Sequence, residues 1–116
     1  MKKLVISFAL LFVILVSQSY AQDQIASKDA KDNIGKTIQV KGKVATIFVS
    51  QKGTTFINFD EKSPNQTFTV VLMSGTDIDI SKIKEESILT VYGEIKEYKG
   101  KPEIILNKSE QIISIE

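Results

Sequence analysis

The stretch "GEIKEYKGKPEIILN", from Gly93 to Asn107, decides the fold. It predicts two short strands joined by a turn at Lys99-Gly100, because isoleucines recur in the flanks and lysines gather at the turn. It begins with a glycine inside a strand, and the similar stretch "VKGKV" (Val40–Val44) places Gly42 in the same setting. Glycine weakens the interior of a strand, so its presence there indicates a bulge, a bend or the close approach of another segment. We therefore expect these two glycines to mark corners at which long strands curl.

Period-two alternation extends the pattern along the chain. It predicts strands at "TIQVKGKVATIFV" (Thr37–Val49), "TTFINFD" (Thr54–Asp60), "TFTVVLM" (Thr67–Met73), "ILTVYGEIKEY" (Ile88–Tyr98) and "KPEIILN" (Lys101–Asn107). The final residues, "QIISIE", add one more short extended run. In the first strand the alternation slips after Ala45, which predicts a bulge, and Gly42 is the expected place for it.

Two short helical segments are expected beside these strands. "SKDAKDNIG" (Ser27–Gly35) predicts a short helix with Ser27 as its N-cap and Gly35 as its stop. The acidic, non-alternating connection "SGTDIDISKIKEES" predicts a helical turn around Ile78 to Ile83.

The order of these elements predicts an all-β domain over residues 37–116. Three strands, a short helical connection and two further strands are the layout of a five-stranded, partly open Greek-key barrel, the OB-fold. In such a barrel the long strands must coil, which gives the two strand glycines a role as corners. The alternative is a flat two-layer sandwich in which those glycines have no such role.

The N-terminal residues 1–21 have the three parts of a secretory signal peptide. Two lysines precede an apolar run from Leu4 to Val16, and the small residues Ser19 and Ala21 precede an expected cut before Gln22. A transmembrane anchor is the alternative, although the run is shorter than the roughly 20 residues of a span. Cleavage would leave an N-terminal segment at 22–36 and the barrel, secreted or periplasmic and without a membrane span. With no cysteine, a lipid-anchored lipoprotein is excluded.

The composition argues against an enzyme. The chain has no histidine and no cysteine, so it has no imidazole base, no thiol nucleophile and no His/Cys metal cluster. Asp77 and Asp79 offer two carboxylates to a hard cation, but they lack the EF-hand spacing, and we interpret them as caps of a helical turn. We therefore predict no catalytic residue, no metal and no cofactor.

Charge is segregated along the chain. All 15 basic residues are lysines, and removing Lys2 and Lys3 leaves 13 against 14 acids, a net charge of −1 that excludes a polybasic binder. Residues 33–59 nevertheless contain four lysines and no acid. In an OB barrel, the loops between strands one and two and between strands four and five belong to the ligand face. Those loops would carry Lys52, Lys99 and Lys101.

Aromatic and polar side chains complete a candidate surface for single-stranded nucleic acid, on which lysines neutralise phosphates and rings stack on bases. The candidate residues are Lys52, Phe56, Asn58, Tyr98, Lys99 and Lys101. Each has a structural alternative: Phe56 covers the outer side of the barrel, and the turn lysines only keep a sheet edge soluble. Phe48 and Phe68 are expected in the core.

The segments "IGKTIQVKGKV", "TTFINFD", "FTVVLM", "TVYGEIKEYKGKPEIILN" and "QIISI" resemble a family of bacterial OB-fold modules of the anticodon-binding type. The family pattern opens with Gly-Lys-x-Val-x-Val-x-Gly-x-Val, continues with a Phe-Leu-Asn-Phe strand, and ends with Tyr-x-Gly-x-Pro-Glu-Ile-x-Leu and a Gln-Ile tail. The run from Tyr98 to Leu106 is the most specific match. Two departures stand out: Glu86-Ser87 occupies a position that is often Gly-Lys, and Asp60 follows Asn-Phe where glycine is common.

The resemblance implies nucleic-acid binding by a module that occurs alone behind a signal peptide or attached to secreted nucleases. Together with the residues, it leads us to expect a monomeric, non-enzymatic binding module whose ligand is single-stranded nucleic acid. The alternative is a periplasmic OB-fold adaptor that binds a protein or a small ligand. OB barrels serve both purposes, so the fold by itself does not choose between them.

Overall fold

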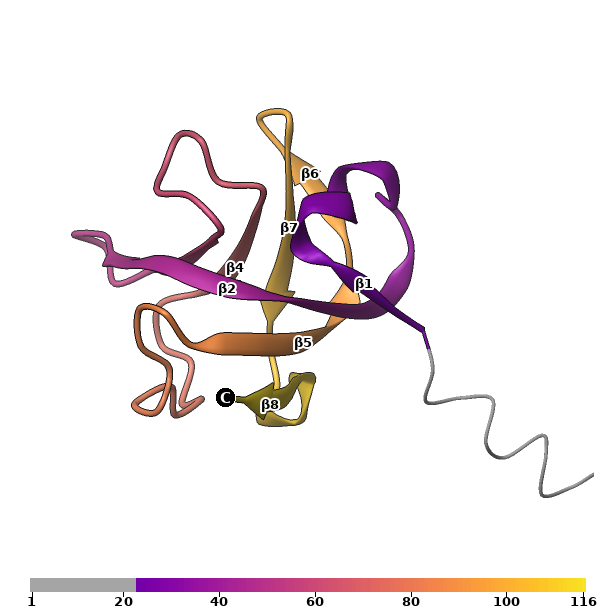
Figure 1. The fold of residues 1–116 in the computed structure, drawn as a ribbon. Helices are drawn as coiled ribbons and strands as arrows, with labels where there is room; N and C mark the ends of the chain where they lie inside the picture. Colours follow the sequence, from indigo (N-terminus) through magenta and orange to yellow (C-terminus); the bar gives the residue numbers. More distant parts are fainter. Residues whose placement is uncertain (1–22) are drawn as a thin grey trace, which may run out of the picture.

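The computed structural model describes residues 23–116, which form one open mixed sheet of eight strands with two short 3-10 helices (Figure 1). The strands are β1 (Gln24–Ala26), β2 (Thr37–Val49), β3 (Thr55–Phe59), β4 (Phe68–Leu72), β5 (Ile88–Glu94), β6 (Lys96–Tyr98), β7 (Lys101–Leu106) and β8 (Ile112–Ile115). The helices are η2 (Ser27–Asp32) and η3 (Ser109–Gln111). In this part of the chain, no helix has the length and apolar character needed to cross a membrane. The expected signal peptide at residues 1–21 lies outside the described residues.

The all-β class is confirmed, but the predicted count of five strands is too low. The predicted fourth strand is divided at Ile95, whose side chain is fully buried and whose backbone leaves the ladder. The Ile95 N–H donates to the carbonyl of Lys36 at 2.9 Å, and its own carbonyl accepts from the Gly35 N–H at 2.7 Å. The run at the C-terminus is β8, and β1 was not expected because its three residues show no alternation.

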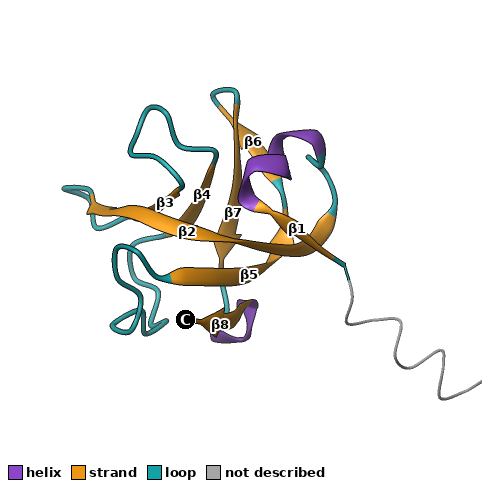
Figure 2. Cartoon of the chain, in the orientation of Figure 1, coloured by secondary structure: helices purple, strands orange, loops and turns teal. Residues whose placement is uncertain are grey.

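The sheet follows the order β6-β7-β4-β3-β2-β5-β8, with β1 beside β2. Within this sheet, β1–β2 and β4–β7 pair in parallel, and the other neighbours are antiparallel. The first half of β2, Thr37 to Lys43, pairs with β5, whereas its second half, from Val44 to Val49, pairs with β3. Figure 2 shows β2 running along the molecule between β3 and β5. One long strand therefore joins the two halves of the sheet.

The bulge in β2 lies at Ala45 rather than at Gly42, because the register with β3 shifts between Val44 and Thr46. Gly42 has a different role, which is close packing. A Cβ at this position would lie 2.2 Å from the Ser27 Oγ and 2.9 Å from a ring carbon of Phe59.

Gly93 is in the same situation on β5. A Cβ there would lie 2.8 Å from the Ile104 Cγ2 and 3.1 Å from the Gln111 Nε2. Because both strand glycines lack a Cβ, side chains from other elements can pack directly against their backbone. They are needed for packing against the sheet, and neither is the site of the bulge.

The core lies on one face of the strands, as the alternation predicts. Ile57 and Phe59 of β3 point inward, and the Phe59 ring meets the Phe68 ring edge to face, with centroids 5.0 Å apart. The expectation that Phe68 is a core residue is confirmed. The other fully buried large side chains come from β2, β4, β5, β7 and the β5–β6 junction: Val40, Val44, Val70, Leu89, Val91, Ile95, Ile104 and Leu106.

The N-terminal helix is present as the 3-10 helix η2, which contacts β2, β4 and β7 and buries Ala30. Its N-cap is Ala26 rather than Ser27. Ser27 is instead the first helical residue and is 2% exposed. Its hydroxyl does not cap the helix and donates a longer-range hydrogen bond to Asp60.

The predicted helical turn between β4 and β5 is wrong. This connection consists of turns and loop (Figure 2), anchored by the buried side chains of Ile78 and Ile83. The Asp79 carboxylate accepts the Ser81 N–H at 2.9 Å, and this local bond competes with helical pairing. The same bond, followed by the Ser81 hydroxyl, lowers the pKa of the Asp79 carboxyl. Asp79 thus stabilises a turn, and the described residues contain no group of three or more acidic side chains placed to hold a metal ion.

Candidate ligand-binding cleft

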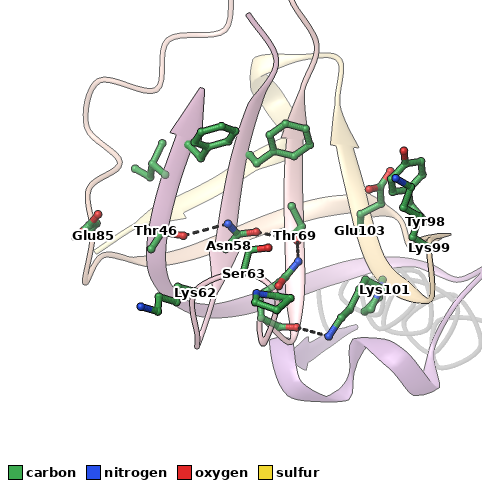
Figure 3. Close-up of a pocket in the computed structure, with 16 residues that line it drawn as sticks. Thr46, Asn58, Lys62, Ser63, Thr69, Glu85, Tyr98, Lys99, Lys101 and Glu103 are labelled. Atoms are coloured by element: carbon green, nitrogen blue, oxygen red, sulfur yellow. Dashed lines mark hydrogen bonds between the residues drawn. The ribbon is translucent and has the colours of Figure 1, made fainter. Parts of the chain in front are cut away.

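A cleft of about 840 Å³ lies on the face of β2, β3, β4 and β7 opposite the core (Figure 3). The β6–β7 hairpin forms one wall, and the loop from Lys62 to Gln66 contributes to another. Because successive side chains of a strand point to opposite faces, the cleft residues Phe56 and Asn58 alternate with the core residues Ile57 and Phe59 along β3.

A row of polar side chains crosses the floor of the cleft. Asn58 of β3 is paired in register with Thr46 of β2 and Thr69 of β4, which places all three side chains side by side. The Asn58 amide donates to the Thr46 hydroxyl at 3.0 Å and accepts from the Thr69 hydroxyl at 3.1 Å. Thr69 in turn accepts from the Gln66 amide at 3.3 Å, so the row continues into the loop (Figure 3). Asn58 is only 5% exposed, and these bonds compensate for its burial.

An aromatic pair lies next to this polar row. Phe48 of β2 and Phe56 of β3 are paired in register and stack with ring centroids 6.3 Å apart and an interplanar angle of 27°. Phe48 is 58% exposed, so the expectation that it belongs to the core is wrong. It shares a face with Thr46, two residues away on β2, and that face is turned away from the core.

The β6–β7 hairpin presents Tyr98 and two lysines to the cleft. Its turn has left-handed φ angles at Lys99 (50°) and Gly100 (79°), as a two-residue hairpin turn requires. The Lys99 Nζ lies 5.3 Å from the centroid of the Tyr98 ring, within the range of a cation–π contact. The Lys101 Nζ donates to the Gln66 carbonyl at 3.4 Å, which ties the hairpin to the opposite loop (Figure 3).

Glu103 of β7 is half-buried in the same cleft. Its burial raises the pKa of its carboxyl above the ordinary value, and the positive charge of Lys96, which is opposite it on β6, offsets only part of that rise. Within residues 23–116, the Glu103 carboxylate accepts no hydrogen bond and forms no ion pair within 4 Å. The cleft therefore carries both signs of charge, with Lys62, Lys99 and Lys101 against Glu85 and Glu103.

Five of the six candidate residues predicted from the sequence line this cleft: Phe56, Asn58, Tyr98, Lys99 and Lys101. Lys52 is exposed in the β2–β3 turn and does not line it. That turn projects away from the β6–β7 turn (Figure 1).

The cleft also contains Phe48, Thr46, Thr69 and Glu103, which were not predicted from the sequence as site residues. Their positions follow from the pairing of β2, β3, β4 and β7. The alternation within each strand gives the two faces, but it does not give the register between strands that brings these side chains together.

No known protein-family profile matches the chain, and no curated protein matches it either. Solved structures do match it in fold. A protein assigned as an aspartyl-tRNA synthetase from Leishmania major Friedlin aligns with 77% of the chain at a TM-score of 0.54 and 15% identity, and the chain spans about a fifth (20%) of that protein. OBody AM1L10, bound to hen egg-white lysozyme, aligns with 77% of the chain and 90% of its own length at a TM-score of 0.55 and 12% identity. OBody AM2EP06, also bound to hen egg-white lysozyme, gives the same TM-score at 16% identity. The chain therefore has an OB-like fold.

Proposed function

We propose that this protein is a non-enzymatic OB-fold binding module and that its cleft binds single-stranded nucleic acid. One observation carries the proposal: aromatic rings and lysines from separate strands and loops converge on one cleft outside the core. The rings belong to Phe48, Phe56 and Tyr98, and the ammonium groups belong to Lys62, Lys99 and Lys101. Bases stack on aromatic faces and phosphates attract lysines, so this combination fits an unpaired strand.

The proposal includes a closed barrel. β5 pairs with β2 and β6 pairs with β7, and Ile95 is the only residue between β5 and β6. The chain itself thus joins β6, at one end of the sheet order, to β5, the second strand from the other end, which supports an OB barrel whose closure passes through Ile95. A closed sheet would hold the hairpin wall at a fixed angle to the floor of the cleft.

The location is also a proposal. The signal-peptide pattern of residues 1–21 supports secretion or the periplasm, as does the resemblance to bacterial modules that follow signal peptides. Expression with and without residues 1–21, followed by fractionation, tests it. Retention of both forms in the cytoplasm would contradict it.

Fluorescence anisotropy with a labelled oligothymidylate of about ten nucleotides tests the function. We expect binding that weakens between roughly 50 and 200 mM salt, with a log–log slope near 0.7 for each lysine–phosphate contact. Phe48→Ala and Phe56→Ala should each lower the affinity about tenfold, because the loss of one stacking contact costs about 1–3 kcal/mol.

Tyr92→Ala is the matched control, since Tyr92 is an exposed aromatic residue of β5 that does not line the cleft. It should leave the affinity unchanged. If the oligonucleotide does not bind even at low salt, the nucleic-acid proposal is wrong.

The alternative is an adaptor that binds a protein, and the two OBody structures favour it because both are bound to lysozyme. For this alternative, the aromatic pair would contact apolar side chains of the partner. Binding of a protein ligand with little dependence on salt, together with no binding of oligonucleotides, would support the adaptor.

A further inference from the structure

On the hairpin wall of the cleft, the Glu103 carboxylate is a group that a phosphate-binding surface does not explain. It lies among residues that would attract a polyanion, yet its own charge repels phosphate. It is half-buried and has no hydrogen-bond or ion-pair partner among residues 23–116. A carboxylate in such a setting has lost part of its hydration, and no protein donor replaces the lost hydrogen bonds. N–H groups of a ligand could donate those hydrogen bonds.

The register of the β6–β7 hairpin places an aromatic ring beside this carboxylate. Lys96 pairs with Glu103, and Tyr98 pairs with Lys101, so all four side chains lie on one face of the hairpin. Tyr98 is therefore the diagonal neighbour of Glu103, at the roughly 7–8 Å of such pairs. A base stacked on the Tyr98 ring would extend an edge toward Glu103, while Lys99 and Lys101 would remain beside it for phosphates.

The Asn58 and Thr69 side chains of the floor do not compete for the same ligand donors. Both ends of the Asn58 amide are engaged with threonine hydroxyls, and the Thr69 hydroxyl donates to Asn58. Glu103 is thus the strongest free acceptor that the floor and hairpin wall offer to a bound base.

We propose that Glu103 makes the cleft selective for guanine, by accepting the N1–H and N2–H donors of a guanine that is stacked on Tyr98. This inference rests on the proposed binding of single-stranded nucleic acid. Guanine is the base with two adjacent donors on one edge, and the two carboxylate oxygens match them. Cytosine and adenine offer one exocyclic amino group, and thymine offers one ring N–H between two carbonyl oxygens, which the carboxylate repels.

Three labelled oligonucleotides of about ten nucleotides test the proposal. One is an oligothymidylate, the second has a single central guanine, and the third has hypoxanthine at that position, which keeps N1–H and lacks the 2-amino group. The wild-type protein should bind the guanine strand about tenfold more tightly than the oligothymidylate, as expected for a good bidentate contact. The hypoxanthine strand should fall between the two.

Two variants separate the role of Glu103 from a general effect of charge. Glu103→Gln should lose most of the guanine preference, to less than about threefold, and its affinity for oligothymidylate should rise because a charge that repels phosphate is removed. Glu97→Gln removes the same charge from the same hairpin, but Glu97 is exposed and does not line the cleft. It should keep the full preference for guanine.

The failure of this inference can be distinguished from failure of the proposed function. Equal affinity of the wild-type protein for all three strands would overturn guanine selectivity, while nucleic-acid binding would still stand. A guanine preference that survives in Glu103→Gln would also overturn it. If none of the strands binds at low salt, the proposed function itself fails.

Discussion

The hydroxyl of Ser27 donates a hydrogen bond to the carboxylate of Asp60 across 33 residues of sequence, with an Oγ–Oδ2 distance of 2.6 Å. Thr67 donates to the same carboxylate oxygen from the other end of the β3–β4 loop. Asp60 thereby connects the N-terminal helix η2 to the end of β3 and to the start of β4. The φ angle of Asp60 is 70°, in the left-handed region that favours glycine.

Glu86 is the other position where this chain departs from a glycine of the family it resembles, and its φ angle is 76°. The two departures therefore coincide with left-handed backbone, which explains why glycine is common there. At Asp60, the cost of the left-handed backbone is offset by the hydrogen bonds that its carboxylate accepts from two hydroxyl groups. Glu86 has an exposed ion pair with Lys43 at 2.6 Å, which also raises the pKa of the Lys43 ammonium group.

Replacing Glu86 by glycine should increase stability. The left-handed conformation costs a non-glycine residue about 1–2 kcal/mol, whereas exposed ion pairs contribute little and glycine loses somewhat more chain entropy. We expect a gain of about 1 kcal/mol in the free energy of unfolding, or roughly 4–8 °C in Tm for a domain of this size. Glu86→Ala is the control, because it removes the ion pair and keeps the strained backbone, and it should not be stabilising.

The same replacement by glycine at Asp60 should lower the stability instead of raising it. Asp60→Gly relieves the backbone but leaves the buried Ser27 hydroxyl without its acceptor, which costs about 1–3 kcal/mol. We expect a lower Tm. Asp60→Asn keeps an acceptor oxygen and tolerates the left-handed region, so it should stay close to the wild type. A stabilising Asp60→Gly variant would show that the hydroxyl bonds do not hold η2 in place.

Alanine at either strand glycine should be destabilising. The added methyl group would overlap Ser27 and Phe59 at position 42, or Ile104 at position 93, and crowding of this kind costs about 1–3 kcal/mol. Chemical denaturation of Gly42→Ala and Gly93→Ala measures the effect. Gly100→Asn is the control, because Gly100 has open space and a φ of 79° that asparagine accepts. Unchanged stability of both alanine variants would contradict the packing role of the two glycines.

The half-buried Glu103 carboxyl should make stability depend on pH. Its pKa is raised in the folded protein, so the stabilisation from its bound proton is fully present below the ordinary pKa of about 4.3 and is lost as the pH rises through the folded value. Glu103→Gln does not titrate. Its Tm relative to the wild type should therefore be higher at neutral pH than near pH 4.

Glu97→Gln gives the baseline for this measurement, because it removes one exposed charge from the same hairpin. A Tm difference for Glu103→Gln that stays constant across the acid range, after subtraction of that baseline, would show that burial of Glu103 has no effect on stability.

Alternation was sufficient to predict β2, β3, β4 and β7, because each has one face in the core. It failed at Ile95, where an inward-facing isoleucine fits the pattern of the strand while its backbone pairs with Gly35 and Lys36. Such a break depends on a segment about 60 residues away in the sequence, and no local pattern records it. The turn at Asp79 was missed for a different reason: aspartate caps helices and turns by the same kind of hydrogen bond.

The candidate site was partly predictable for the same reasons. Phe56 and Asn58 could be assigned to a face opposite the core from β3 alone, and Tyr98, Lys99 and Lys101 followed from the hairpin turn. Phe48 could not be assigned, because its exposure depends on pairing with Phe56 across two strands. Lys52 was placed near the ligand only by the general layout of OB barrels, which does not fix the direction of a turn.

The alternation of β3 has a consequence for how this protein can change over time. Ile57 and Phe59 support the fold, and their sequence neighbours Phe56 and Asn58 belong to the cleft. Substitutions at cleft positions outside the buried hydrogen-bonded row, such as Phe56, leave the interior packing untouched, so the ligand can be exchanged through single replacements without a new scaffold. On β3, positions that tolerate replacement therefore alternate with positions that the core fixes. A library of variants restricted to the cleft positions would sample new specificities while the protein stays folded.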